Sequence, residues 1–379
     1  MRGDDAETEQ NCSPFYILEQ EWEPVNPNSG HEAKTSETSM KRIITPIPIS
    51  PSFSPPNPGI GSVNPQHKQH QMPHMAEGKM SFFQWQMQKE AIRMEGVDLK
   101  MLNMQDEDGD TCLHIAVAKG KRAVACVLAQ KMAAIGSLDV KEHKGQTALH
   151  IAVATNQHLI VQDLLANGAQ INMRDCWGRS PLHVCAERGH FLTLKTIHRV
   201  LTGSWQQSDT EMFNYDGLTA LHTAVLSQNA VVKELTCATA PLSATVVMEL
   251  QWRRRMYEEC IQTLLLMGAC CETRDLKHGR TSLHMAAEVA NVELFRLFLE
   301  KPASLSIVNA RTFSGNTALH IVSSLQSHDY QVGAVRLLVR RGADPSGKNA
   351  ENDRPAQLAP KGPIGDKVRQ ILKGKPTVS

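Results

Sequence analysis

Six histidines end a repeated Thr/Ser-x-Leu-His cassette, and with the nine cysteines they are the side chains best suited to binding a metal ion. They are His114, His150, His183, His222, His284 and His320. A metal site needs ligands that converge on one point about 2 Å away. Each histidine instead occupies the same slot of a different repeat, which is too far from the next to share an ion. The pattern therefore predicts a structural role, in which the imidazole binds turn backbone and the Thr or Ser hydroxyl caps a helix.

Other catalytic signatures are missing from the sequence. It has no Gly-x-x-x-x-Gly-Lys loop for phosphate, no His-Glu-x-x-His motif for zinc and no Gly-x-Ser-x-Gly turn for a nucleophilic serine. We therefore expect a protein that binds other proteins, with no enzyme activity, no cofactor, no metal and no small-molecule substrate.

The spacing of the cassettes indicates a stack of repeats. Consecutive histidines are 36, 33, 39, 62 and 36 residues apart. Each cassette follows a glycine turn and opens a short Ala-rich inner helix, which a bulkier outer helix follows. This pattern resembles the ankyrin repeat, whose unit is about 33 residues. We predict an all-α ankyrin-repeat solenoid over residues 105–375, with six clear repeats and a degenerate seventh in which Gln357 replaces the histidine.

The 62-residue interval predicts an insertion. Subtracting one repeat leaves about 29 extra residues, and the outer helix reappears only near Tyr257. We place the insertion at about 233–255 and expect it to loop out without breaking the stack.

Two further regions precede the repeats. Residues 1–78 hold 11 of the 19 prolines, with 5 Lys/Arg against 10 Asp/Glu, and we expect an acidic, disordered tail. Within it, residues 15–22 (Phe-Tyr-Ile-Leu-Glu-Gln-Glu-Trp) are typical of segments that fold on a coactivator, although a chance apolar island is an equal alternative. Residues 79–104 carry Phe82, Trp85, Ile92 and Met94, which predict a short amphipathic helix that caps the first repeat.

Composition limits where the chain can act. Asp4, Asp5, Glu7 and Glu9 stand where a signal peptide would need apolar residues, and no apolar run approaches the roughly 18 residues of a membrane span. The odd number of cysteines, several at apolar helix positions such as Cys126, favours reduced thiols in an intracellular protein.

Four residues near two turn tips are the candidates for binding a partner. They are Arg174, Trp177, Arg179 and Tyr215. Trp, Tyr and Arg are the residues that most often dominate protein interfaces, and turns of repeat proteins project into solvent. The alternative is that Trp177 only covers its own neighbouring loop. Basic clusters at 253–255 and near the C-terminal end are interpreted as solvated helix faces.

Several segments outside the general repeat pattern resemble one family in more detail. They are residues 81–86, 108–111, 114–117, 141–143, 156–161, 175–179, 214–217 and 371–375. They resemble the atypical, nuclear branch of the IκB family, over about residues 79–375.

The resemblance implies a nuclear coregulator of inflammatory genes. Its repeats would bind Rel-homology dimers of NF-kappa-B, chiefly those of the small subunit, and would meet DNA only through that partner. Two features agree with this branch. The tail has no Asp-Ser-Gly-x-x-Ser motif for triggered degradation, and beyond Gly342 seven Lys/Arg face four Asp/Glu, so this end would not repel DNA.

Two alternatives remain open at this stage. A stoichiometric inhibitor of the IκB type would bind the same dimers but remove them from DNA. A general ankyrin adaptor would bind other proteins, although no recruitment motif is apparent after Lys375.

Overall fold

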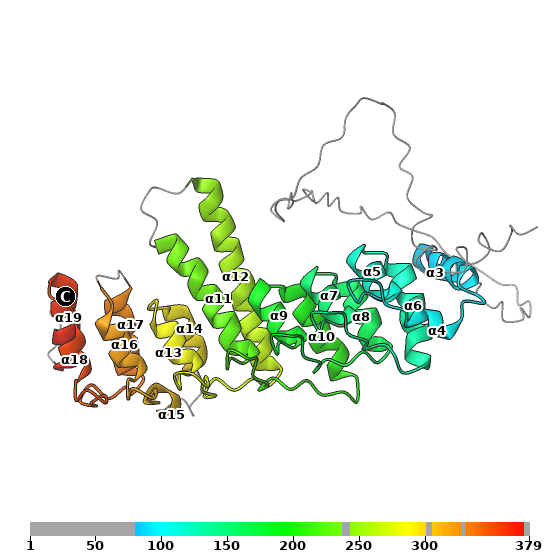
Figure 1. The fold of residues 1–379 in the computed structure, drawn as a ribbon. Coiled ribbons are helices and arrows are strands. Elements are labelled where there is room, and N and C mark those ends of the chain that lie inside the picture. Colours follow the sequence, from blue (N-terminus) through cyan, green and yellow to red (C-terminus); the bar gives the residue numbers. More distant parts are fainter. Residues whose placement is uncertain (1–79, 237–242, 301–304, 327–329, 375–379) are drawn as a thin grey trace, which may run out of the picture.

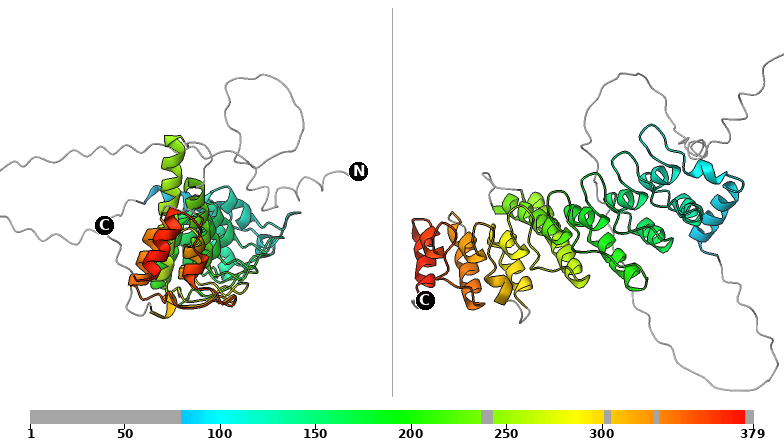
Figure 2. Two further views of the ribbon diagram at one scale, coloured as in Figure 1. Left: turned by 90° about the vertical axis from the view of Figure 1, so that its left-hand side faces the viewer. Right: turned by 60° about the horizontal axis from the view of Figure 1, so that its bottom comes forward.

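The computed structural model describes residues 80–236, 243–300, 305–326 and 330–374. Every regular element within these ranges is a helix, and no strand occurs there. Pairs of helices lie side by side along one axis and form an elongated stack (Figure 1). Figure 2 shows the same stack end-on and from a tilted direction. This is the all-α repeat architecture that the sequence predicts; the tail expected at 1–78 lies outside the described residues.

Each of the seven repeats contributes an inner and an outer helix. The pairs are α5 (Cys112–Ala118) with α6 (Arg122–Ala134), α7 (Ala148–Ala154) with α8 (His158–Ala166), α9 (Pro181–Arg188) with α10 (Phe191–Thr202), α11 (Ala220–Thr236) with α12 (Ala244–Leu266), α13 (Ser282–Ala287) with α14 (Val292–Phe298), α16 (Ala318–Ser324) with α17 (Gln331–Arg340), and α18 (Pro355–Leu358) with α19 (Pro363–Leu372). Helices α3 (Phe82–Arg93) and α4 (Leu99–Leu102) precede the first pair, and the short α15 (Leu305–Val308) lies between the fifth and sixth.

The inner and outer helices bury side chains of different size. Ala152 of inner helix α7 and Ala224 of inner helix α11 are fully buried, which lets neighbouring inner helices approach closely. Outer helices contribute larger side chains such as Leu164 and Ile197. The result is one continuous apolar core that extends from Met94 to the final helix.

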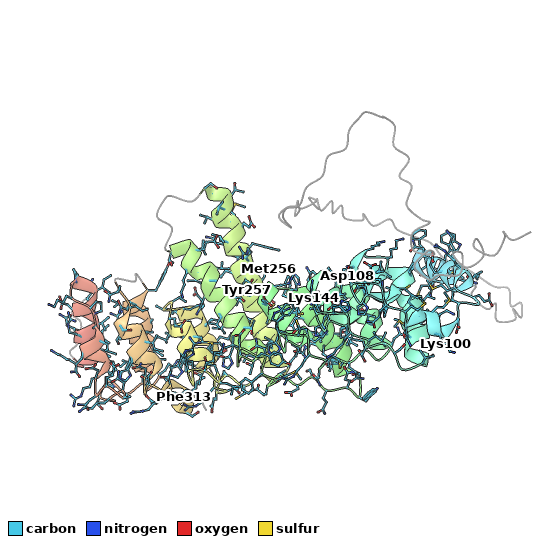
Figure 3. The ribbon with its side chains drawn as sticks, in the orientation of Figure 1. Lys100, Asp108, Lys144, Met256, Tyr257 and Phe313 are labelled. Carbon is cyan, nitrogen blue, oxygen red and sulfur yellow. The ribbon has the colours of Figure 1, made fainter. Side chains whose placement is uncertain are left out.

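The insertion is helical rather than a loop in its described part. Helices α11 and α12 both continue beyond the stack and form a projecting hairpin, with only residues 237–242 between them outside the described ranges (Figure 1). Val231, Leu250 and Tyr257 give this hairpin a small core of its own. The Tyr257 hydroxyl also donates to the Glu187 carbonyl at 3.0 Å, where the hairpin meets α9 (Figure 3). Because these contacts lie to one side of the repeat layers, the stack continues past the insertion.

Different helices cover the apolar faces at the two ends of the stack. At the N-terminal end, Met94 after α3 and Leu102 of α4 are buried against the first repeat. At the other end, Gln357 takes the place of the histidine, and its Oε1 accepts the Arg354 N–H at 2.9 Å. Leu372 of α19 then covers the seventh repeat.

The described residues contain neither a membrane-spanning helix nor a metal-binding cluster. None of their helices is both long enough and apolar enough to cross a membrane. The same ranges contain no cluster of three or more His, Cys, Asp or Glu side chains placed to hold a metal ion.

Candidate protein-interaction surface

Five of the six repeated histidines, all except His114, connect their repeat to the next. Thr147 donates its backbone N–H to His150 Nδ1 at 3.2 Å, so this ring nitrogen carries no proton. The proton is then on Nε2, which donates to the Arg179 carbonyl of the following turn at 3.2 Å. His183 and His222 bind the next turn in the same way, through the carbonyls of Leu218 and Thr273, each at 3.0 Å. The imidazoles therefore hold the turns in register and are structural.

Burial keeps these imidazoles uncharged. Desolvation lowers the pKa of His150 and of His284 to about 4. The hydrogen bonds to turn carbonyls raise both pKa values, but their effect is smaller than that of burial. Burial lowers the pKa of the other four histidines as well. At neutral pH each ring therefore accepts from its own cassette, and all of them except His114 also donate to the next turn.

Backbone hydrogen bonds join successive turns into a continuous edge. Tyr215 N–H donates to the Trp177 carbonyl at 3.0 Å, and Leu276 N–H donates to the Gly217 carbonyl at 3.0 Å. Phe313 N–H donates to the His278 carbonyl at 2.9 Å. Each turn thus rests on the one before it, and the edge behaves as one surface.

Two turn glycines leave room for the aromatic ring of the next turn. Gly178 has a φ of 73°, and a Cβ there would lie 2.6 Å from the Tyr215 ring. Gly279 has a φ of 67°, and its Cβ would lie 2.6 Å from the Phe313 ring. Only glycine satisfies both the positive φ and the close approach. These glycines therefore set the positions of the exposed rings.

A row of large apolar side chains lies along this edge, which we call the fingertip row. It consists of Trp177, Tyr215, Leu276 and Phe313, with exposed fractions of 49%, 70%, 60% and 67%. The row runs from the third repeat to the sixth, and Figure 3 labels Phe313 at its far end. Exposed apolar side chains that are contiguous and held by rigid backbone are typical of protein-binding surfaces.

The structure brings three of the four predicted contact residues together. The Arg179 guanidinium lies 4.5 Å from the centre of the Trp177 ring, and Tyr215 is hydrogen-bonded to the Trp177 carbonyl. Arg174 is exposed on the same turn, and no hydrogen bond or ion pair joins its guanidinium to another described residue. Its carbonyl accepts Lys141 Nζ at 2.7 Å.

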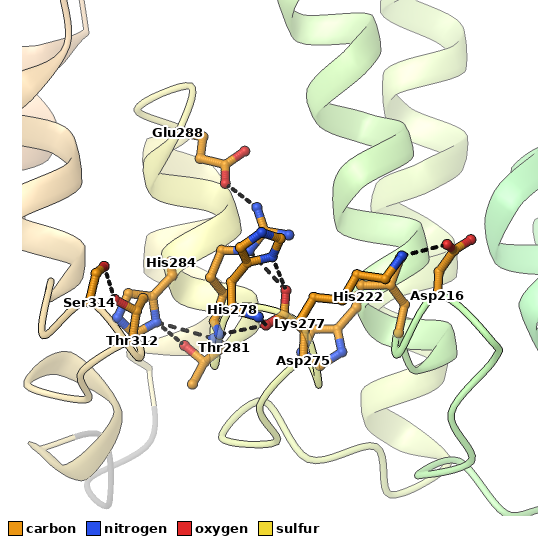
Figure 4. Close-up of polar contacts among 12 residues, drawn as sticks. Asp216, His222, Asp275, Lys277, His278, Thr281, His284, Glu288, Thr312 and Ser314 are labelled. Carbon is orange, nitrogen blue, oxygen red and sulfur yellow. Dashed lines mark hydrogen bonds and ion pairs between the residues drawn. The ribbon is translucent and has the colours of Figure 1, made fainter.

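Arg179 also has a structural role. Its Nε lies 2.9 Å from an Asp175 carboxylate oxygen, and its Nη1 lies 2.7 Å from Glu187. The fifth repeat repeats the arrangement with Arg280, which binds Asp275 at 2.9 Å and Glu288 at 2.8 Å (Figure 4). Because Asp175 and Glu187 already bind the Arg179 guanidinium, Arg179 would contribute to partner binding mainly by supporting the Trp177 ring.

Sequence reasoning missed Leu276 and Phe313. A signal was present, because Phe313 stands two residues before its turn glycine, as Tyr215 does. Leu276 stands three residues before Gly279 in a turn that is one residue longer. Aligning the turns on their glycines therefore finds Phe313 from Tyr215, and allowing for the extra residue of the longer turn also finds Leu276.

The turn edge carries charges of both signs. The first turn holds four carboxylates, and burial together with the neighbouring Asp106 raises the pKa of Asp110. Two arginines join later turns: Arg274 binds the Arg311 carbonyl, and Arg311 in turn binds the Lys348 carbonyl at 2.8 Å.

Comparisons with known proteins agree with this architecture. The family model described as ankyrin repeats (3 copies) matches residues 77–175, 154–245 and 253–349. Human NF-kappa-B inhibitor zeta is 54% identical over 295 residues, which are 78% of this chain and 41% of that protein. Mouse NF-kappa-B inhibitor delta is 41% identical over 72% of this chain and 80% of its own length.

A solved structure gives the same result. The crystal structure of the ankyrin repeat domain of Bcl-3, described as a unique member of the IκB protein family, covers 71% of this chain and 100% of its own. The TM-score is 0.55 and the sequence identity 33%. The chain spans about two fifths of the length of the zeta proteins that it matches. With its repeats, its cassettes and this likeness, the chain belongs to the ankyrin-repeat proteins and, among them, to the IκB family.

Proposed function

We propose that the chain is a nuclear transcriptional coregulator that binds NF-kappa-B dimers through the fingertip row, with dimers of the small subunit preferred. Its relatives are named as inhibitors of NF-kappa-B, which supports this choice of partner. The observation that carries the proposal is the row itself, because four large apolar side chains stand exposed on a rigid edge.

The C-terminal end supports a coregulator over an inhibitor that removes NF-kappa-B from DNA. Lys361, Lys367 and Lys373 are exposed around α19, whereas Asp366 is paired with Arg369 at 2.5 Å. A cationic end can lie near DNA held by the same partner without electrostatic repulsion.

An electrophoretic mobility shift with the full chain, each NF-kappa-B dimer and a κB duplex tests the proposal. A slower-moving ternary complex, formed best with small-subunit dimers, is the expected result. Release of free DNA would identify an inhibitor instead. Absence of any effect on every dimer would contradict NF-kappa-B binding and leave a general ankyrin adaptor.

A matched pair of variants tests the site. Replacing Tyr215, Leu276 and Phe313 together by serine should weaken the ternary complex by at least about a hundredfold, since central apolar contacts are each worth roughly 1–2 kcal/mol. Trp205→Ser is the control, because Trp205 is 83% exposed outside the row. Equal affinity of both variants, with unchanged helix content by circular dichroism, would remove the row from the interface.

A further inference from the structure

Helix α3 uses one face to cap the stack. Met87 packs against the core, and Glu90 and Met94 are buried there. The Phe83 ring lies 4.0 Å from the Arg122 guanidinium of α6. These contacts explain how α3 can cap the first repeat. They involve Phe83, Met87 and Met94, and they leave the other large apolar residues of α3 unused.

The opposite side of α3 is apolar and uncovered in the structure. Phe82, Trp85 and Ile92 are 72%, 51% and 63% exposed, and their spacing of three and seven residues puts them on one side of the helix. The Phe82 and Trp85 rings stack with centres 5.8 Å apart, and Lys89 Nζ lies 5.9 Å from the Trp85 ring centre. We call these four residues the outer α3 face.

The charges on α3 favour an acidic occupant. Lys89 is exposed beside the rings. The only carboxylate on the helix, Glu90, is buried, and its oxygen lies 3.5 Å from Arg93. A ridge of apolar side chains with a cation beside it complements a segment that interleaves apolar side chains with carboxylates.

We propose that residues 15–23 of this chain bind the outer α3 face. The segment lies outside the described residues, and its sequence offers what the face lacks. It supplies Phe15, Tyr16, Ile17, Leu18 and Trp22 as apolar groups and Glu19, Glu21 and Glu23 as carboxylates.

The chain connects the two partners directly. The tail joins α3 at Met80, and 57 residues separate this position from Trp22. The average end-to-end distance of a random coil of that length is about 40 Å, which exceeds the roughly 18 Å length of α3. Tethering also gives the segment an effective concentration of the order of 1 mM, so even a weak site would be filled.

Other occupants match the face less well. A second copy would bring Lys89 and Arg93 of both chains together, which is electrostatically unfavourable. The apolar residues at 43–49 of the tail carry no carboxylate to face Lys89.

Hydrogen exchange of the full chain, followed by mass spectrometry, tests the proposal. Amides in residues 13–24 should exchange about tenfold or more slowly than in a free peptide of this sequence, as expected for a site with a dissociation constant about ten times below the effective concentration. The Phe82→Gln/Trp85→Gln double variant should lose this protection. Both side chains are more than half exposed, so the repeats remain folded in this variant.

The matched control is the Leu192→Gln/Trp205→Gln double variant, which changes two exposed apolar residues away from α3 and should keep the protection. Free-peptide exchange rates in the unmodified chain would overturn the proposal. So would protection that survives in the Phe82→Gln/Trp85→Gln variant. Protection that disappears on about hundredfold dilution would assign the face to a second copy instead.

Discussion

Acid should weaken the stack through its buried histidines, most clearly through His150 and His284. Both have a pKa of about 4 when folded, against about 6.5 when unfolded. The unfolded chain therefore binds more protons, so this contribution to stability is complete above about pH 6.5 and is lost as the pH falls toward 4.

The size of the effect follows from the two pKa values. Between pH 7.5 and pH 5.5 each unfolded histidine gains nearly a full proton while the folded ring stays neutral, which costs about 1.4 kcal/mol of unfolding free energy per residue. The two together should cost about 3 kcal/mol.

The chain supplies its own control substitution. Gln357 occupies the histidine slot of the seventh repeat and accepts the cap hydrogen bond without titrating. The His150→Gln/His284→Gln variant should therefore lose about 3 kcal/mol less than the unmodified chain between the two pH values. Urea unfolding followed by circular dichroism, at pH 7.5 and pH 5.5, measures both differences.

The comparison cancels carboxylate effects, because both proteins share every Asp and Glu. A lower stability of the variant at both pH values would only reflect the lost Nε2 hydrogen bonds. The reasoning is refuted if the two proteins show the same change between pH 7.5 and pH 5.5, since the buried rings would then not be what acid acts on.

Three further predictions follow from single contacts. Gly279→Ala should destabilise the stack by about 1–3 kcal/mol more than Gly268→Ala in thermal unfolding, because both positions have positive φ but only the first Cβ would meet a ring. Leu276→Ser and Phe313→Ser should each weaken the proposed binding of NF-kappa-B by about 1–2 kcal/mol in titration calorimetry, with no change in melting temperature beyond about 2 °C. Ser282→Ala should be neutral or stabilising by up to about 1 kcal/mol in urea unfolding, because the buried Ser282 hydroxyl has no hydrogen-bond partner and three other cassettes hold alanine there.

The repeated elements were predictable because their signals are local. A cassette, its cap and its turn glycine lie within about ten residues, so the sequence alone places inner helices such as α7 and turns such as the one at Gly178. The histidine role was predictable for the same reason, because Thr147 and His150 are three residues apart. Only the second bond, from Nε2 to the next turn, needs the structure, since its carbonyl lies 29 residues away.

The candidate surface was only partly predictable because it is built across repeats. Tyr215 stands out in the sequence as an aromatic at a turn, but its N–H binds the carbonyl of Trp177, which belongs to another repeat. Arg179 looks like a free hot-spot residue in the sequence, whereas both of its arms are bound by Asp175 and Glu187. Such partners become visible only once the turns are stacked.

Helix α3 and the hairpin of α11 and α12 each keep apolar side chains that the core does not bury. An apolar residue in a sequence indicates a helix face but not which neighbour that face meets, so Phe82 and Met94 look equivalent until the first repeat is placed beside them. A solenoid repeat contacts only its neighbours, and an element at its edge therefore keeps one side without a partner in the stack. The apolar side chains left there, Trp85 on α3 and Trp252 on the hairpin, are more than half exposed and are not needed for the core. Side chains that the core does not need are free to bind another segment or protein. The outer α3 face is therefore the surface on which we propose a contact in addition to the fingertip row.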